Sequence, residues 1–192
     1  MEKPEKCLIA CPIFKDELEI MLPSNVNFNL HFMDFRVHND AQRMFQELDS
    51  AVHSAGNCNI ALLVGRECYC ETPIADFAKS VNARIVNEKN CIEAILGPER
   101  ADVLQQHRTT IHTKGWMRMI RQFVADDGLN ADSIRMMLGF FDRILLIDYG
   151  INAFSDDDII AYYDLLQVPI QIEPVQLSYF RGVLSRLLEW PE

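Results

Sequence analysis

The cysteines are the residues of this sequence best suited to chemistry. The chain has six of them, at positions 7, 11, 58, 68, 70 and 91. Clustered cysteines of a reducing compartment bind metal ions or act as nucleophiles more often than they form disulfides. No C-x-x-C pair occurs in the sequence. The chemistry therefore depends on which thiols the fold brings together.

Short apolar runs alternate with amphipathic segments along the whole chain. Strands are predicted over 6–11, 28–35, 59–64, 83–87, 108–113, 143–150 and 168–174. Helices are predicted over 16–22, 39–55, 73–81, 91–97, 116–126, 131–141, 156–166 and 176–190. This alternation is typical of an α/β fold. We expect a three-layer, doubly wound, mostly parallel sheet of six or seven strands, in a single α/β domain over residues 1–192.

Four cysteines fall just after predicted strands. Cys11 ends the first strand, and Cys91 follows the fourth at the start of a helix. Cys68 and Cys70 follow the third strand, and Tyr69 between them leaves only one of the pair as a ligand. Parallel strands lie about 4.8 Å apart and present their carboxyl ends at one edge, where ligands bind. Cys11, Cys91 and one of Cys68 and Cys70 could therefore meet around one metal ion, for which Zn²⁺ is the simplest choice.

The remaining two cysteines are not predicted to lie at this carboxyl edge. Cys7 lies about 13 Å back along the first strand, and Cys58 precedes the third strand, at the opposite edge. Both are expected to be ordinary small buried or half-buried residues, and all six cysteines are expected to be reduced.

Few side chains are available for a fourth ligand position. His38 follows the second strand and His112 lies near the end of the fifth, and each is a candidate ligand, general base or surface residue. Glu17 follows Cys11 closely and would either support a metal ligand through a hydrogen bond or face solvent. An open fourth position would indicate catalysis, whereas a closed one would indicate a structural site.

The turn TKGW at 113–116 is a second candidate for binding a cofactor or substrate. Gly115 before a helix permits close backbone approach to an anion, and Trp116 would form the wall of a pocket. A plain strand-to-helix turn with a core tryptophan fits the same residues. Neither G-x-G-x-x-G nor a P-loop follows the first strand, which argues against a dinucleotide or P-loop site.

Composition narrows the class of partner. The net charge is −10 and basic residues are scattered among acids, which argues against nucleic-acid binding. No apolar run approaches the roughly 20 residues of a membrane span, and no secretory signal is recognised, so we expect a cytoplasmic protein. The acids at 156–158 follow Ser155 and are interpreted as a helix N-terminus. A homodimer is the base-rate expectation.

Several segments resemble a known family. They are LIACPIFKDEL, FRVHNDAQRMFQEL, IALLVGRECY, ARIVNEKNCIEAILG, TTIHTKGW and RILLIDYGIN. Over most of the chain they resemble an uncharacterised family, domain of unknown function 1638. The family pattern has a Cys followed by a Glu, a His-Asn pair, a Gly-x-Cys-Gly type turn, a further Cys, a Leu-Gly and a Thr-bearing turn before an aromatic helix. The residues of this sequence that match the pattern are Cys11, Glu17, His38, Asn39, Cys68, Cys91, Gly97, Thr113 and Trp116.

The resemblance implies a metabolic context rather than a particular reaction. Such proteins resemble those of anaerobes and methanogens, often associated with corrinoid-dependent methyl transfer, which implies a small-molecule or corrinoid-system partner. This chain lacks the D-x-H-x-x-G signature of corrinoid carriers. It also has Tyr69 where the pattern often has Gly, which is expected to narrow the pocket and leaves Cys70 as an extra thiol. The first hypothesis is a metal-binding protein, and the alternative is an accessory or interaction protein with inert or redox-sensing cysteines.

Overall fold

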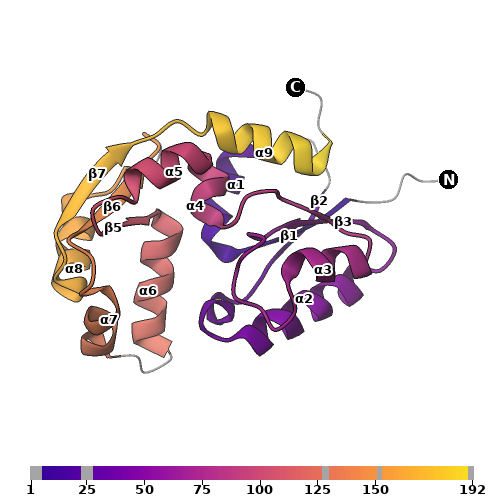
Figure 1. The fold of residues 1–192 in the computed structure, drawn as a ribbon, viewed down its shortest axis with the longest axis horizontal. Helices are drawn as coiled ribbons and strands as arrows, with labels where there is room; N and C mark the ends of the chain where they lie inside the picture. The colour runs from indigo at the N-terminus through magenta and orange to yellow at the C-terminus, as the bar shows by residue number, and fades with distance from the viewer. Residues whose placement is uncertain (1–5, 23–27, 127–129, 151–152, 190–192) are drawn as a thin grey trace. The chain divides into compact units, whose positions relative to one another are not determined.

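The computed structural model describes residues 6–22, 28–126, 130–150 and 153–189, without the side chains of Phe28, Asn39 and Asp126. The chain forms two compact units (Figure 1). The first unit is Met1–Gly97 with Ser178–Glu192, and the second unit is Pro98–Leu177. The single domain over 1–192 stays a prediction, and each unit is described by itself below.

The first unit is built on a parallel sheet of strand order β2-β1-β3-β4. Its strands are β1 (Lys6–Ala10), β2 (Phe28–Phe32), β3 (Asn59–Leu63) and β4 (Arg84–Ile85). Lys6 of β1 is in register with Phe28 and Asn59, and Ala10 with Phe32 and Leu63. The carboxyl ends of β1, β2 and β3 are therefore level. The loops after them begin at one edge, as the alternation of strands and helices predicts.

Helices cover both faces of this sheet. In Figure 1, α2 and α3 lie on one face, and α1 and α9 on the other, which gives the first unit three layers. The helical segments of the unit are η1 (Pro12–Phe14), α1 (Lys15–Met21), η2 (Phe35–Asn39), α2 (Ala41–Ala55), α3 (Ile74–Ser80), α4 (Cys91–Leu96) and α9 (Ser178–Leu188). The predicted end of the last helix at residue 190 lies outside the described residues. Leu8, Ile9 and Leu62 are 0–1% exposed, because both faces of the central strands are covered.

Local sequence explains where α2 begins and ends. The Asp40 side chain accepts hydrogen bonds from the backbone N–H groups of Gln42 and Arg43, both at 3.0 Å. This satisfies donors that the first helical turn leaves open. Gly56 follows the helix at φ +62°, a conformation that side chains disfavour. The helix predicted over 39–55 is thus confirmed almost to the residue.

The second unit contains a parallel sheet of order β5-β6-β7. Its elements are α5 (Pro98–Leu104), β5 (Thr109–His112), α6 (Lys114–Asp126), α7 (Ala131–Leu138), β6 (Arg143–Asp148), α8 (Asp156–Leu166) and β7 (Ile170–Pro174). Ile144 and Leu146 of β6 pack with Ile134 of α7 and Tyr162 of α8 in one buried cluster. Ser155 caps α8 by accepting from the Asp158 N–H at 3.1 Å, so the acidic run does open a helix.

The α/β class and the parallel strands are confirmed. The strands of the described residues, however, form two sheets of four and three strands rather than the one sheet predicted. Among the same residues, no helix combines the length and apolar character needed to cross a membrane.

Candidate functional site

Cys11 stands at the centre of the carboxyl edge of the first sheet. Its N–H donates to the Leu63 carbonyl at 3.1 Å, and the Met33 N–H donates to the Ala10 carbonyl at 3.0 Å. The pairing of β1 with both neighbours thus continues one residue past the strand. The Phe14 N–H then donates to the Cys11 carbonyl at 3.1 Å and turns the chain into η1. Cys11 is 5% exposed, so its thiol is held between the loops that follow β2 and β3.

His38 is brought to Cys11 by η2. The segment is opened by Asp34, whose side chain accepts from the Arg36 N–H at 2.8 Å. Hydrogen bonding to Arg36 lowers the pKa of Asp34 to about 2. The His38 Nε2 atom lies 3.1 Å from the Cys11 Sγ atom, and its Nδ1 atom lies 3.0 Å from the Phe35 carbonyl oxygen. Since a carbonyl only accepts, Nδ1 carries the proton and Nε2 presents its lone pair to the thiol.

Cys68 is positioned by a loop that is fixed to the segment before α4. The N–H groups of Arg66 and Glu67 donate to the carbonyls of Glu88 and Lys89 at 3.0 and 2.9 Å, and the Cys68 N–H donates to the Gly65 carbonyl at 3.1 Å. A Cβ atom at Gly65 would lie 2.4 Å from the Lys89 carbonyl oxygen. Only glycine permits this approach of the two backbones.

Cys91 is the first residue of α4 and is 8% exposed. Asn90 caps the helix, and its side chain accepts from the N–H groups of Ile92 and Glu93, both at 3.0 Å. The Asn90 side-chain oxygen thus satisfies two of the N–H groups that the first turn of α4 leaves open.

Cys68 and Cys91 each lie within electrostatic reach of Cys11. Burial raises the pKa of Cys11 well above its usual value, and charge on Cys91, Cys68 and Glu17 raises it further. Burial also raises the pKa of Cys68 to about 11, with a contribution from Cys70. Burial lowers the pKa of His38, so its ring is neutral near pH 7. Cys11, Cys68, Cys70 and Cys91 form no disulfide.

This gathering is not a preformed coordination shell. Within the described residues, no group of three or more His, Cys, Asp or Glu side chains is arranged to hold a metal ion. Glu17 is completely buried in α1. The side chain of Asn39, the partner of His38 in the family pattern, lies outside the described part of the chain.

The other predicted binding residues belong to the second unit. His112 is 3% exposed, its Nδ1 atom lies 2.8 Å from the Tyr162 hydroxyl, and its Nε2 atom lies 3.3 Å from the Thr110 hydroxyl. Its ring stacks on Trp116 at 5.8 Å. Burial lowers its pKa to about 4. These contacts are those of a neutral core histidine.

The TKGW turn begins its helix earlier than predicted. Helix α6 starts at Lys114, so Gly115 is its second residue and is buried rather than standing before the helix. The Trp116 N–H donates to the Thr113 hydroxyl at 3.3 Å. The Trp116 N–H is therefore already hydrogen-bonded within the protein.

Cys7 and Cys58 differ from the prediction. They form a disulfide, with Cα atoms 5.7 Å apart, so the expectation of six reduced cysteines is wrong. Both residues had been placed at the edge opposite Cys11. The strand order sets β1 beside β3, and the two thiols therefore meet there. Comparing these two cysteines with each other, instead of only with Cys11, would have found the pair.

Glu88 is a buried carboxylate that the sequence did not single out. It is 5% exposed, and its Oε1 atom accepts from the Tyr179 hydroxyl and the Arg186 guanidinium, both at 2.9 Å. A Cβ atom at Gly97 would lie 3.0 Å from the Tyr179 ring. The Leu-Gly of the family pattern thus leaves room for the tyrosine that holds α9 to this carboxylate.

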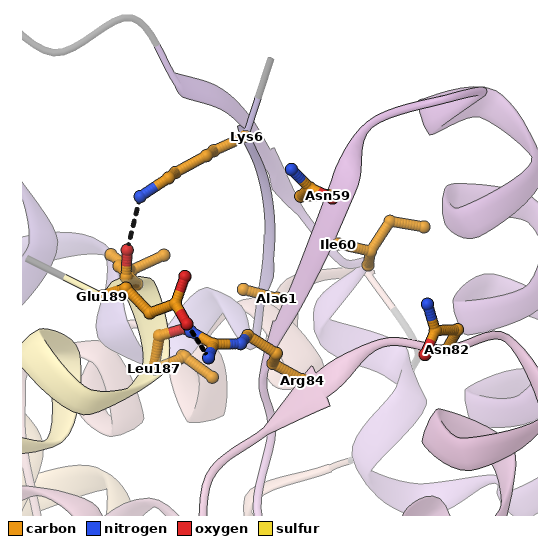
Figure 2. Close-up of a pocket in the computed structure, with 9 residues that line it drawn as sticks. Lys6, Asn59, Ile60, Ala61, Asn82, Arg84, Leu187 and Glu189 are labelled. Carbon is orange, nitrogen blue, oxygen red and sulfur yellow. Dashed lines mark hydrogen bonds and ion pairs between the residues drawn. The ribbon is translucent and has the colours of Figure 1, made fainter. Parts of the chain in front are cut away.

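A cavity of about 270 Å³ lies at the edge of the sheet opposite the thiols (Figure 2). Lys6 and Arg84 enter it from the starts of β1 and β4. Lys6 donates to the Leu188 carbonyl at 2.7 Å, and Arg84 donates to the Leu187 carbonyl at 3.3 Å and pairs with Glu189. Both cations thus stabilise the C-terminal end of α9.

Comparison with known proteins gives one family. The model of the family described as "Protein of unknown function (DUF1638)" matches residues 32–184. No curated protein matches the chain. Because the match covers most of the chain, the chain belongs to this family.

Proposed function

We propose that this member of the DUF1638 family binds a thiophilic metal ion, most simply Zn²⁺, at the carboxyl edge of the first sheet. Cys11, Cys68 and Cys91 would supply thiolates, and His38 would supply an imidazole nitrogen. Three thiolates and one imidazole form a known ligand set of structural zinc sites. The donor chemistry of the residues therefore fits the metal.

The observation that carries the proposal is the Cys11–His38 pair. Metal-binding histidines usually donate one ring N–H to a carbonyl or carboxylate and bind the metal through the other nitrogen. His38 has this orientation, since Nδ1 is bonded to the Phe35 carbonyl and Nε2 lies 3.1 Å from the Cys11 sulfur. The imidazole is thus fixed in the tautomer that a metal ion requires.

Charge supports the same proposal. Glu17 is completely buried, and its charge raises the pKa of the Cys11 thiol. Deprotonating several thiols beside a buried carboxylate is costly unless a cation compensates their charge. A divalent ion would offset this repulsion and keep the thiols deprotonated. Binding would require the cysteine side chains to rotate toward a common point, since the described arrangement holds no preformed shell.

The proposal assigns no reaction. A thiolate-bound Zn²⁺ with a position open to water or substrate acts as a Lewis acid. If His38 occupies that position, the site is closed and structural. The link to corrinoid-dependent methyl transfer stays an implication of the family resemblance.

Element analysis of protein purified without a metal-affinity column tests the proposal. We expect about one equivalent of metal per chain, lost in Cys11→Ser, Cys68→Ser and Cys91→Ser and weakened in His38→Gln. His53→Gln is the matched control, because His53 is an exposed histidine of the same unit. Folded protein that takes up no metal after reduction and exposure to Zn²⁺ would refute the proposal.

The alternative function rests on the Cys7–Cys58 disulfide. A disulfide between the starts of β1 and β3 favours a protein whose cysteines respond to redox conditions. It lies at the edge opposite the proposed metal site. Metal-free protein that still forms this disulfide reversibly would favour the alternative.

A further inference from the structure

The cavity at the edge of the first sheet opposite the thiols contains two cations in an acidic protein. It has a volume of about 270 Å³, and Lys6, Arg84 and the end of α9 line it (Figure 2). Part of its wall is apolar, because the buried residues Ile60 and Ala61 of β3 also line it. The chain as a whole has a net charge of −10. A cavity with two cations therefore differs from the rest of the chain in the ligands that it can attract.

Glu189 already places a carboxylate beside Arg84. The residue follows α9 and has φ +50°, a left-handed conformation that glycine usually takes at the end of a helix. Its side chain pairs with the Arg84 guanidinium and is 66% exposed. Because an exposed ion pair contributes little to stability, the Glu189 carboxylate can leave Arg84 for solvent at small cost. An anion that enters the cavity can then take its place.

The two cations keep donor groups for such an anion. Among the described residues, Lys6 uses one of its three N–H groups, on the Leu188 carbonyl. Arg84 uses two of its five N–H groups, one on the Leu187 carbonyl and one on Glu189. The charge of both cations exceeds that of the Glu189 carboxylate together with the roughly half negative charge at the carbonyl end of a helix. The cavity therefore has positive charge and hydrogen-bond donors left for a ligand.

We propose that this cavity binds a small dicarboxylate. One carboxylate replaces that of Glu189 on Arg84, and the other is held by Lys6. A carboxylate is favoured because it is the group that Arg84 pairs with in the structure. Asn59 and Asn82 line the cavity and are exposed, so their side-chain amides are available to donate to ligand oxygens.

The ligand is small, because the cavity lies below the range of about 300–1,000 Å³ that is usual for larger ligands. The inference does not depend on the proposed metal site, which lies at the opposite edge of the sheet.

Titration with succinate, followed by two-dimensional NMR of isotope-labelled protein at constant ionic strength, tests the proposal. The backbone signals of Lys6, Ile60, Arg84 and the last turn of α9 should shift together and give a Kd of about 1 mM or tighter. Acetate and inorganic phosphate should bind about tenfold more weakly, because each offers a single anionic group to the two cations. Succinamide, which has amides in place of the carboxylates, should not bind.

Variants of the cavity test the role of each charge. Arg84→Met and Lys6→Met should each weaken succinate binding about tenfold or more, because each removes a charged donor. Glu189→Gln should tighten it by up to about fivefold, because it removes the carboxylate that competes for Arg84. Lys79→Met is the matched control, since Lys79 is an exposed lysine of the same unit that does not line the cavity.

Each outcome decides the proposal. If succinate shifts no signal at the cavity, the binding site does not exist. Acetate, phosphate or succinamide binding as tightly as succinate would overturn the assignment to a dicarboxylate. An unchanged affinity in Arg84→Met would overturn the exchange of carboxylates at Arg84. If that variant does not fold, Glu189→Gln decides the same point, because an affinity that stays equal or falls would also overturn the exchange.

Discussion

Acid should destabilise the second unit through one residue, His112. The ring is 3% exposed and packed against Trp116 and Tyr162, and burial lowers its pKa from 6.5 to about 4. The unfolded chain therefore takes up a proton near pH 6.5 that the folded unit does not accept until about pH 4. Stability that is present above pH 6.5 is lost as the pH falls toward 4, because protons bind the unfolded state more tightly.

The size of the effect follows from the two pKa values. One pKa unit corresponds to about 1.4 kcal/mol, so the free energy of unfolding should fall by about 2 kcal/mol between pH 7 and pH 5 and by about 3 kcal/mol by pH 4. The interval from pH 7 to pH 5 is the informative one, since ordinary carboxylates begin to titrate only below it. The corresponding decrease in the urea midpoint is roughly 1 M.

Trp116 provides the assay because its ring stacks on His112. Urea unfolding is followed by tryptophan fluorescence in a Trp190→Phe background, which leaves Trp116 as the chain's one tryptophan. His112→Phe combined with Tyr162→Phe removes the titrating ring together with its hydroxyl partner, so no buried hydroxyl loses that hydrogen bond. The double variant should lose most of the decrease between pH 7 and pH 5. His107→Asn, at an exposed position of the same unit with φ +56°, should keep the full decrease. An equal pH dependence in the double variant and the unchanged protein would contradict the reasoning.

Three further predictions concern the first unit. Gly65→Ala should lower the free energy of unfolding by about 1–3 kcal/mol, because its Cβ would lie 2.4 Å from the Lys89 oxygen and 2.5 Å from the Asn90 Cα. Gly56→Ala, at φ +62° but with open space around the added Cβ, should lower the free energy of unfolding by about 1 kcal/mol. Equal losses of stability for Gly65→Ala and Gly56→Ala in thermal melts would refute the role of the contact between Gly65 and the backbone of residues 89 and 90. Lys6→Met and Arg84→Met should each cost up to about 1 kcal/mol and speed hydrogen exchange in the last turn of α9, with no change in α2. Alkylation followed by mass spectrometry should modify Cys7 and Cys58 only after reduction, and modification of both without reductant would exclude the disulfide.

The elements were predictable because their signals are local. Apolar runs marked the strands, and Ser155 marked the start of a helix. The parallel direction of β1 to β4 also followed, since strands joined by helices favour it. The division into two sheets was not predictable, because no local pattern states whether a strand as short as β4 pairs with β5. Pairing between strands is decided by packing over the whole sheet.

The candidate site was predictable only in part, for the same physical reason. Because parallel strands end at the same edge of a sheet, the residues that follow them, Cys11, Cys68 and Cys91, are placed at one edge. This prediction does not depend on how the side chains pack. The choice between His38 and His112 depends on which loop folds back to the end of β1. The spacing of residues along the sequence does not give the distance of either histidine from Cys11. The Cys7–Cys58 pair was within reach of the sequence argument, since the predicted strand ranges already placed both residues at the edge opposite Cys11.

Comparing His38, which is half-buried, with His112, which is buried, shows why burial alone does not identify a ligand. Both rings are neutral because burial lowers their pKa. The His112 nitrogens face two hydroxyl groups, which can donate or accept, so the ring is satisfied by its neighbours. The Nδ1 atom of His38 is bound to a carbonyl, and its Nε2 atom faces a thiol whose proton a metal ion can displace. Exchange of a proton for a metal is therefore open to His38 and Cys11 without any loss of the Phe35 hydrogen bond. At His112 the same exchange would break a hydrogen bond to Tyr162 or Thr110 and open a packed core. This difference in cost, rather than residue type or burial, is the reason to propose His38, and not His112, as the ligand of the proposed metal ion.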